Sequence, residues 1–280
     1  MIELPEAYVL SEQINKTLLG KTIKKAEANV HPHGFAWFSG DPKTYNSKLK
    51  GKKITGSNPG TGYTCGGNIE IACEDTLLVI STPIKYHEPD GKLPPKHQLL
   101  IEFDDHSHMS CTVQMWGAMF CFSVKENGIP EKYSIKKCPD PLTDAFNEDY
   151  FNTLWKEVKP SLSAKAFLAT EQRIPGLGNG VLQDVLWNAG IHPKRKLATM
   201  SGKDKKKLFT SVKSTLLKMK NRGGRDTERD LFGKNGGYKT ILSANTLKNP
   251  CPVCRSELIR EAYMGGNIYY CPVCQPLEVK

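Results

Sequence analysis

The spacing of apolar residues changes twice along the chain. From Pro5 to Leu19 apolar side chains recur every three or four positions, which predicts an amphipathic helix, and Gly20 ends it. From there to about residue 125, short apolar runs are separated by breaks rich in Gly, Pro and Asp. The clearest runs are Ile69–Cys73, Leu77–Ile80, Leu99–Phe103 and Met119–Val124. Short strands at this spacing favour a β-sandwich or barrel preceded by one helix.

Helical spacing returns in the second half. Residues 126–143 are rich in Pro, Lys and Gly and lack periodicity, which indicates a linker. Helices are predicted at Tyr150–Val158, Ala164–Thr170, Leu182–Ala189 and Lys203–Lys220. We therefore expect an α+β multidomain protein with a leading helix and β-sandwich (1–127), a linker (128–148), a helical domain (149–245) and a cysteine-rich module (246–280).

Charge is distributed unevenly between the two halves. Residues 1–150 hold 16 Lys and Arg against 19 Asp and Glu, a net charge of −3, whereas residues 151–280 hold 23 against 10, a net charge of +13. A half this basic suits a polyanion, because neutralised phosphates release condensed counterions. A merely solubilising surface is the alternative. The lysine-rich run 203–207 is predicted to be an exposed helix start rather than an element that recognises a nucleic-acid sequence.

The chain has no run of eighteen apolar residues, so neither a membrane span nor a membrane partner is expected. Glu3 and the absence of a signal-peptide pattern predict an intracellular protein, either cytoplasmic and associated with the nucleoid or nuclear. Five of the nine cysteines are scattered, and in a reducing compartment we expect them to be small buried apolar residues. They are Cys65, Cys73, Cys111, Cys121 and Cys138.

The other four cysteines form the most specific signal in the chain. Cys251-Pro-Val-Cys254 and Cys271-Pro-Val-Cys274 are separated by sixteen residues, which is the spacing of a four-cysteine zinc site. Two such turns close a tetrahedral shell, so a single Zn²⁺ would be structural rather than catalytic. The segment between them has the pattern of a β-hairpin. A zinc ribbon alone is shared by repair, transcription and ribosomal proteins.

A glycine-rich turn runs into a predicted helix in the segment 174–193. Gly176, Gly178 and Gly180 permit a tight turn, after which backbone N–H groups at a helix start can receive a phosphate oxygen. Asn179 can add a side-chain donor. A dinucleotide-binding turn is disfavoured because helical residues, and no strand, precede the glycines. A turn made only for packing is the alternative.

Together these elements resemble the formamidopyrimidine-DNA glycosylase / endonuclease VIII family. Lys165 to Pro193 is similar to the family's helix–two-turns–helix motif, and Cys251 to Gln275 is similar to its zinc finger. The opening Met-Ile-Glu-Leu-Pro-Glu is similar to the family's Met-Pro-Glu-Leu-Pro-Glu. The resemblance implies a monomeric base-excision repair protein that binds damaged duplex DNA, extrudes a nucleotide and cleaves its glycosidic bond.

By this resemblance, Glu3 would carry protons, Glu6 would belong to the same catalytic centre, and the turn with Lys165, Gly178 and Asn179 would bind phosphates. The family's nucleophile is the amine of an N-terminal proline, and here Ile2 takes its place. Because removal of the initiator generally needs a small second residue, we expect Met1 to be retained. The free amine would then lie up to about 3.6 Å further out.

Other family positions differ as well. Asn68 stands where the family has a lysine in an N-terminal hairpin, and Asn267 lies near the position of a phosphate-binding arginine, for which Arg260 is a candidate substitute. Ile84, Met115 and Trp116 are large and apolar, so they are candidates for the wedge that fills the gap left by an extruded base. Ordinary sandwich core is the alternative for these three.

Three further segments carry polar groups. His31-Pro32-His33 and Asp104–His108 could hold a metal, but solvated turns are favoured because no partner is fixed by spacing. The glycine-rich stretch 222–238 corresponds to a loop that lies over the extruded base in the family, with a plain connector as the alternative.

The resemblance thus predicts a divergent DNA glycosylase that uses Glu3 with the Met1 amine or an activated water, with weak or absent AP-lyase activity. The alternative of the same fold is a non-catalytic protein that binds damaged DNA, which Ile2 and Asn68 favour. A zinc-ribbon protein acting on RNA or in transcription is a third reading.

Overall fold

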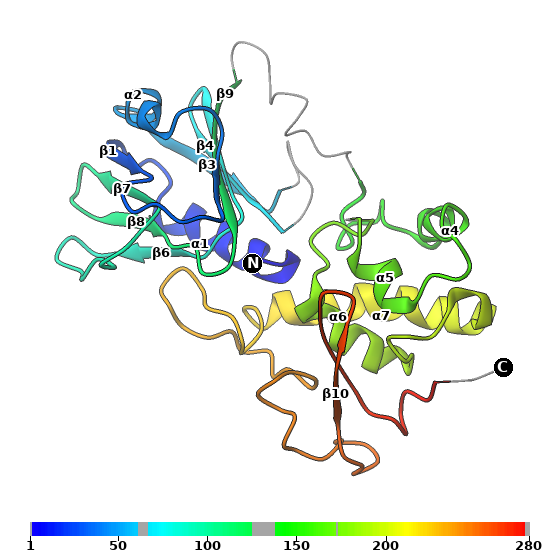
Figure 1. Cartoon of the computed structure of the whole chain (residues 1–280). Coiled ribbons are helices and arrows are strands. Elements are labelled where there is room, and N and C mark those ends of the chain that lie inside the picture. The colour runs from blue at the N-terminus through cyan, green and yellow to red at the C-terminus, as the bar shows by residue number, and fades with distance from the viewer. Residues whose placement is uncertain (1, 61–66, 125–137, 172, 278–280) are drawn as a thin grey trace. The chain divides into compact units, whose positions relative to one another are not determined.

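The computed structural model describes residues 2–60, 67–124, 138–171 and 173–277 (Figure 1). The chain divides into two compact units. The first comprises residues 1–137 together with 227–236, and the second comprises 138–226 and 237–280. The cysteine-rich module is therefore part of the second unit, and ten residues that follow the helices in sequence belong to the first. Residues 125–137, which include the first part of the expected linker, lie outside the described part of the chain.

The first unit begins with helix α1, Leu4–Thr17, close to the predicted range. Pro5 stands in its first turn, where a missing N–H costs nothing. Its apolar face, which includes Ala7, Leu10 and Ile14, is buried in the core of the unit. Gly20 follows with φ +82°, a conformation that ends the helix because other residues rarely adopt it.

Two sheets form a sandwich, as predicted. One has the strand order β1-β7-β8-β6 and the other β2-β9-β5-β4-β3. The first sheet contains β1 (Ile23–Ala28), β7 (Leu99–Phe103), β8 (His108–Cys111) and β6 (Ile84–His87). The second contains β2 (Ala36–Phe38), β9 (Gly117–Ser123), β5 (Thr76–Ile80), β4 (Ile69–Cys73) and β3 (Ile54–Asn58). A short turn of helix, η1 (Pro42–Thr44), leads into α2 (Tyr45–Leu49).

Strand β5 is buried along its whole length, which its continuous apolar run indicates. Leu78 and Ile80 face the main core, whereas Leu77 and Val79 pack with Phe122 in a second small cluster. Three of the scattered cysteines, Cys73, Cys111 and Cys121, are buried as expected, and Cys138 is partly exposed. Cys65 lies outside the described residues.

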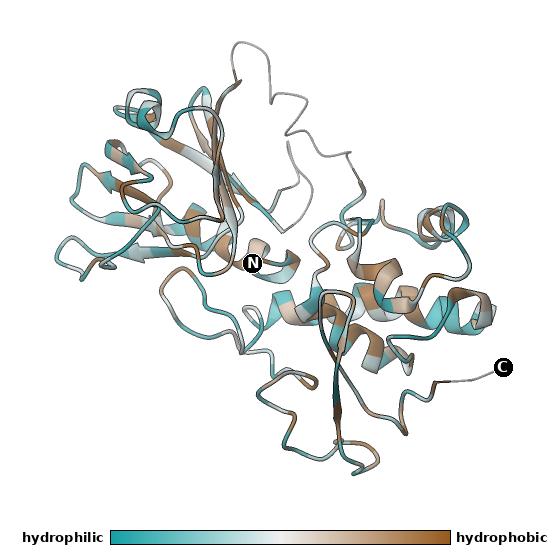
Figure 2. Ribbon diagram, in the orientation of Figure 1, coloured by the Kyte–Doolittle hydropathy of each residue, from teal (hydrophilic) through white to brown (hydrophobic). Residues whose placement is uncertain are grey.

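The second unit holds the predicted helices and the hairpin. They are α4 (Glu148–Lys156), α5 (Ala164–Ala169), α6 (Asn179–Ala189), η3 (Leu197–Thr199), α7 (Gly202–Asn221), β10 (Ile259–Tyr263) and β11 (Gly266–Tyr270). Helix α7 starts with a capping box of Ser201 and Asp204, and the lysines just inside it at 203, 206 and 207 are exposed. This helix carries both hydrophilic and hydrophobic residues (Figure 2), and the apolar residues Leu208, Val212 and Leu216 are buried. In the described part of the chain no helix is long and apolar enough to cross a membrane.

Candidate nucleic-acid interface and metal centre

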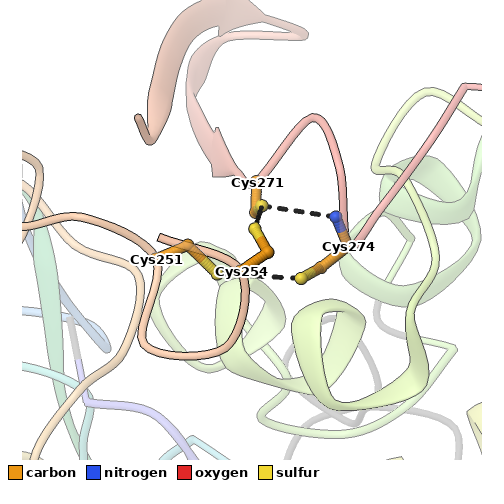
Figure 3. A group of neighbouring side chains, drawn as sticks. All are labelled: Cys251, Cys254, Cys271 and Cys274. Carbon is orange, nitrogen blue, oxygen red and sulfur yellow. Dashed lines mark hydrogen bonds between the residues drawn. The ribbon is translucent and has the colours of Figure 1, made fainter. Parts of the chain in front are cut away.

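The four cysteines of the terminal module converge on one point (Figure 3). Their sulfur atoms all lie within 4.8 Å of one another, with 3.7 Å between Cys251 and Cys274 and 3.4 Å between Cys254 and Cys271. A tetrahedral ion with bonds of about 2.3 Å has ligand atoms about 3.8 Å apart. The donor set and its size therefore fit one four-coordinate metal ion. No other group of three or more His, Cys, Asp or Glu side chains among the described residues converges in this way.

Two glutamines attach this module to helix α6 and to the segment that follows it. Gln275 donates to the carbonyl of Ile191 and accepts from the N–H of Cys271, both near 3.0 Å. Gln183, on α6, accepts from the N–H of Tyr269 at 3.0 Å and donates to the carbonyl of Asn267. The hydrogen bonds of these two glutamines thus fix the cysteine turns and the hairpin to α6 and to the segment that follows it.

The predicted phosphate-binding residues Lys165 and Asn179 meet at the tip of the hairpin. The Lys165 ammonium donates to the carbonyl of Tyr263, and the Asn179 amide donates to the carbonyl of Asn267 at 3.0 Å. A methyl group placed on Gly266 would lie 3.6 Å from both side-chain nitrogens. Glycine at this position therefore keeps open the space beside two hydrogen-bond donors.

Burial lowers the pKa of Lys165, whose side chain is only 4% exposed. The Asn179 Oδ1 atom is buried without a hydrogen-bond partner. A phosphate oxygen next to this pair would compensate the desolvated ammonium, since a charge-assisted hydrogen bond favours the protonated form.

The glycine turn takes the conformation that its sequence predicts. Gly176 has φ +68°, Gly178 is the extended N-cap residue of α6, and Asn179 is the first residue of the helix, three residues earlier than expected. Gly190 ends α6 in the left-handed region, so both ends of this helix depend on glycine.

Arg260 and Asn267 lie on the two paired strands of the hairpin. Arg260 pairs with Tyr269, and Asn267 pairs with Ala262, so their side chains share one face of the two-stranded sheet. The neighbouring positions Glu261 and Tyr263 alternate to the other face, where Glu261 forms an ion pair with Lys194. Arg260 is exposed and lies on the face opposite to that of Tyr263.

In the first unit, the N-terminal residues border a cavity of about 540 Å³. Ile2, Glu6 and Leu10 line one side of it, and β6, β8 and the segment 92–95 line another. Residues 227–230 and Gly233 complete the wall. Glu3 is buried as the N-cap residue of α1. Met1 lies outside the described residues.

The cavity lining combines charges of both signs with neutral polar groups. Lys85, Lys92 and Arg229 are cationic, and Glu6, Glu228 and Asp230 are anionic. His87 forms a 2.8 Å hydrogen bond with the Ser110 hydroxyl, and burial lowers the pKa of its imidazole and so favours the neutral form. The volume is in the range of small-molecule and cofactor pockets, and the many polar groups of the lining suit a polar ligand.

The candidate wedge residues differ in exposure. Ile84 is buried in the core and also lines the cavity, whereas Met115 is 78% exposed and Trp116 is 37% exposed. Gln114, next to them, lines the cavity as well. Asn68 is partly exposed directly before β4 and does not line the cavity.

Two exposed aromatic residues join Met115 and Trp116 in a patch that the sequence did not reveal. Trp37 of β2 is 47% exposed, and its ring centroid lies 5.6 Å from that of Trp116. Phe35 is exposed too, and its carbonyl accepts from the N–H of Gly117. The parallel pairing of β2 with β9 brings these positions together, and a pairing between strands so distant in sequence leaves no local signal. Phe35, Trp37, Met115 and Trp116 are hereafter the aromatic patch.

Comparisons with known proteins identify the family of this chain. A profile of the formamidopyrimidine-DNA glycosylase H2TH domain covers residues 138–229. The formamidopyrimidine-DNA glycosylase of Prochlorococcus marinus is 31% identical over 215 residues, which cover 75% of this chain and 70% of that protein. This chain belongs to the formamidopyrimidine-DNA glycosylase family.

Similarity to other members of this family extends over the whole chain. The formamidopyrimidine-DNA glycosylase of Carboxydothermus hydrogenoformans is 27% identical over 281 residues, covering 98% of this chain and all of that one. The Lactococcus lactis Fpg in complex with DNA containing an abasic site has the same fold, with a TM-score of 0.81 and 22% identity over 98% of this chain and 99% of that one. The Thermus thermophilus protein gives a TM-score of 0.80 at 18% identity, covering 99% of this chain and all of that one.

Proposed function

We propose that this protein is a DNA glycosylase that removes a modified base from duplex DNA. The observation that carries the proposal is the cavity beside the N-terminus, which Ile2 and Glu6 line and whose size suits an extruded base. Its relatives are named formamidopyrimidine-DNA glycosylases, and solved complexes of the Lactococcus lactis protein contain abasic or Fapy-dG DNA. The same DNA substrate would place the protein at the nucleoid or in the nucleus. We further propose that it acts as a monomer.

In the proposed reaction a nucleophile bonds to C1′ of the sugar as the glycosidic C1′–N bond breaks, and the departing base takes up a proton. Glu3, at the start of α1, would transfer this proton. Glu6, which lines the cavity, would belong to the same catalytic centre. The nucleophile is either the amine of Met1 or a water molecule. With Ile2 at the family's proline position, we propose that AP-lyase activity is weak or absent.

A second function, binding of damaged DNA without cleavage, is favoured by two substitutions. Ile2 and Asn68 replace the proline and the lysine that react or bind phosphate in the family. In that case Lys165 and Asn179 would still bind DNA phosphates, whereas the residues of the reaction centre would no longer catalyse base release.

We propose that the metal is a single structural Zn²⁺, held by Cys251, Cys254, Cys271 and Cys274. Four thiolates leave no open coordination position, so the ion would fix the hairpin and not the reaction.

Borohydride trapping on duplexes that carry an abasic site or an oxidised base tests the function directly, with base release measured in parallel. An adduct mapped to Met1 would identify an amine nucleophile and a bifunctional enzyme. Base release without an adduct would indicate a water-using glycosylase. Tight binding with neither product, across a broad panel of lesions, would contradict the glycosylase proposal and support the binding protein.

The aromatic patch predicts a preference for unpaired bases. We expect Trp116→Ala to raise Kd for a duplex with an abasic site by roughly 5- to 150-fold, because loss of one base-stacking ring costs about 1–3 kcal/mol. Trp37→Ala should act in the same direction. Binding to the undamaged duplex should change little, and Leu19→Ala, which removes an exposed apolar residue outside the patch, is the control. Equal weakening on both duplexes, measured by fluorescence anisotropy, would rule out a wedge role.

The cluster at the hairpin tip predicts binding to the DNA backbone. We expect Lys165→Met and Asn179→Ala to weaken binding to every duplex alike, and Lys165→Met to reduce the slope of log Kd against log salt by about 0.9, the value of one phosphate contact. Lys203→Ala removes the same charge from an exposed position and is the matched control. A salt slope unchanged from that of the unsubstituted protein would contradict the phosphate contact of Lys165.

A further inference from the structure

The segment 227–236 forms a small hairpin that belongs to the first unit, although it follows the helices of the second in sequence. Arg229 pairs with Asn235, and the N–H of Gly236 donates to the carbonyl of Glu228. Asp230 closes the turn, since its carboxylate accepts from the N–H groups of Phe232 and Lys234 at 3.0 and 2.8 Å. The hairpin is therefore an ordered element with its own hydrogen bonds.

This hairpin is attached to the sandwich by one apolar and one polar anchor. Leu231 is fully buried in the core of the first unit, its carbonyl accepts from the N–H of Tyr86 at 2.8 Å, and the ring of Phe232 packs edge-on against Tyr86. The polar anchor is Gln13 of α1. Its amide donates to the Asp230 carboxylate at 2.9 Å and accepts from the Leu231 N–H at 2.9 Å.

Only a side chain with both a donor and an acceptor can make this pair of contacts. A carboxylate can only accept and a backbone N–H can only donate, so the two partners also fix the orientation of the Gln13 amide. Leucine of similar size would lose both bonds. Glutamate would keep the bond to Leu231 but would place a second negative charge against Asp230.

Gln13 shares a helix face with residues of the cavity. Glu6, Leu10 and Gln13 are spaced by four and three positions along α1, which puts them on one side of the helix. The first two line the cavity directly, whereas Gln13 does not line it. Helix α1, which carries Glu6 and has Glu3 as its N-cap residue, thus also holds the part of the cavity wall formed by residues 227–230 through Gln13.

The wall residues can recognise the polar edge of a base. Glu228 can accept from a ring N–H, and Arg229 can donate to two neighbouring acceptors such as a carbonyl oxygen and a ring nitrogen. Such contacts discriminate between bases only if the wall is held in place. A buried polar group that is misaligned with its hydrogen-bond partner lowers the affinity for the base.

We propose that Gln13 is a positioning residue that fixes the 227–236 hairpin as a preformed wall of the base pocket, and that discrimination between damaged bases depends on it. The inference rests on the proposed function, because it takes the cavity to be the site of the extruded base. A duplex with a tetrahydrofuran abasic analogue presents no base to the wall, and it is therefore the matched control substrate.

The test compares the unsubstituted protein with Gln13→Leu, Gln13→Glu and the control Glu12→Gln, which changes an exposed neighbour on the same helix. The lesion duplex is the one from which the unsubstituted protein releases the base most efficiently. We expect Gln13→Leu to lower kcat/KM for base release by about 10- to 100-fold, since a misplacement of about 1 Å can cost two orders of magnitude. Binding of the tetrahydrofuran duplex should stay unchanged, and Gln13→Glu should give the same pattern.

Limited trypsin digestion reports on the hairpin itself. Cleavage after Arg229 and Lys234 should accelerate in Gln13→Leu, because a released loop is a preferred site of proteolysis, and should not change in Glu12→Gln. Unchanged base release, or a parallel loss of base release and tetrahydrofuran binding, would overturn the proposal.

Failure of the proposed function has a different signature. If the unsubstituted protein releases no base from any duplex, the glycosylase proposal fails. The lesion duplex is then the one that the protein binds most tightly, and the ratio of its Kd to the Kd for the tetrahydrofuran duplex replaces base release. A ratio that rises in Gln13→Leu would still support the positioning role, and an unchanged ratio would overturn it.

Discussion

Base release by Glu3→Gln is expected to fall by about 10²- to 10⁴-fold, the usual contribution of a positioned general acid or base. Glutamine has the same size and keeps a polar oxygen, but it cannot take up and return a proton. Because Glu3 is buried at the first position before α1, an isosteric change avoids a cavity and should leave the fold intact. Single-turnover base release at saturating enzyme isolates this chemical step from binding.

Binding of a tetrahydrofuran duplex provides the comparison, because it requires no proton transfer. It should be the same for Glu3→Gln and for the unsubstituted protein. Glu12→Gln, an exposed change of the same kind on the same helix, should alter neither quantity. Base release that survives in Glu3→Gln would show that another group carries the proton, and loss of binding as well would indicate a structural role for Glu3.

Loss of the metal is expected to abolish tight binding of DNA. Apparent free energies of metal binding in structural zinc sites are about 10–16 kcal/mol, so the hairpin should not remain folded without the ion. Tyr263 and Asn267, whose carbonyls accept from Lys165 and Asn179, would then lose their fixed positions. We expect Cys254→Ala to reduce the metal content measured by native mass spectrometry and to weaken binding to all duplexes together.

Cys138→Ala is the matched control, since this cysteine lies in the second unit and is no member of the four-sulfur cluster. It should keep one metal ion and full affinity. Full affinity of the Cys254→Ala protein after loss of its ion would contradict the expected link between the metal site and the proposed phosphate-binding residues Lys165 and Asn179. Retention of the ion would instead show that three sulfurs suffice to hold it.

Several parts of the fold could be predicted because their signals are local. The spacing in α1, the unbroken apolar run of β5 and the glycines at both ends of α6 determine these elements from neighbouring residues alone. The pair of Cys-Pro-Val-Cys turns likewise specifies a four-sulfur site, because the ligand spacing within each turn fixes its geometry. The family was recognisable from the glycine turn, the paired cysteine turns and the first six residues, in this arrangement along the chain.

Other features depend on contacts between distant positions and left no local trace. The sequence did not single out Trp37, and the parallel pairing of β2 with β9 placed it beside Trp116. Ile84 and Met115 are both large and apolar in sequence, yet one is buried and the other exposed. Burial is decided by which elements pack together, and hydrophobicity alone does not reveal it.

By itself the sequence determined the α+β class, the leading helix, the main helices of the second unit and the four-cysteine cluster, and it singled out Lys165 and Asn179 as the proposed phosphate-binding pair. Only the tertiary structure showed that residues 227–236 belong to the first unit and that Gln13 holds them there. The physical reason is range: periodicity and motif spacing act over a few residues, whereas the contact between Gln13 and Asp230 joins positions 217 residues apart. Such a contact forms only when the whole unit has folded.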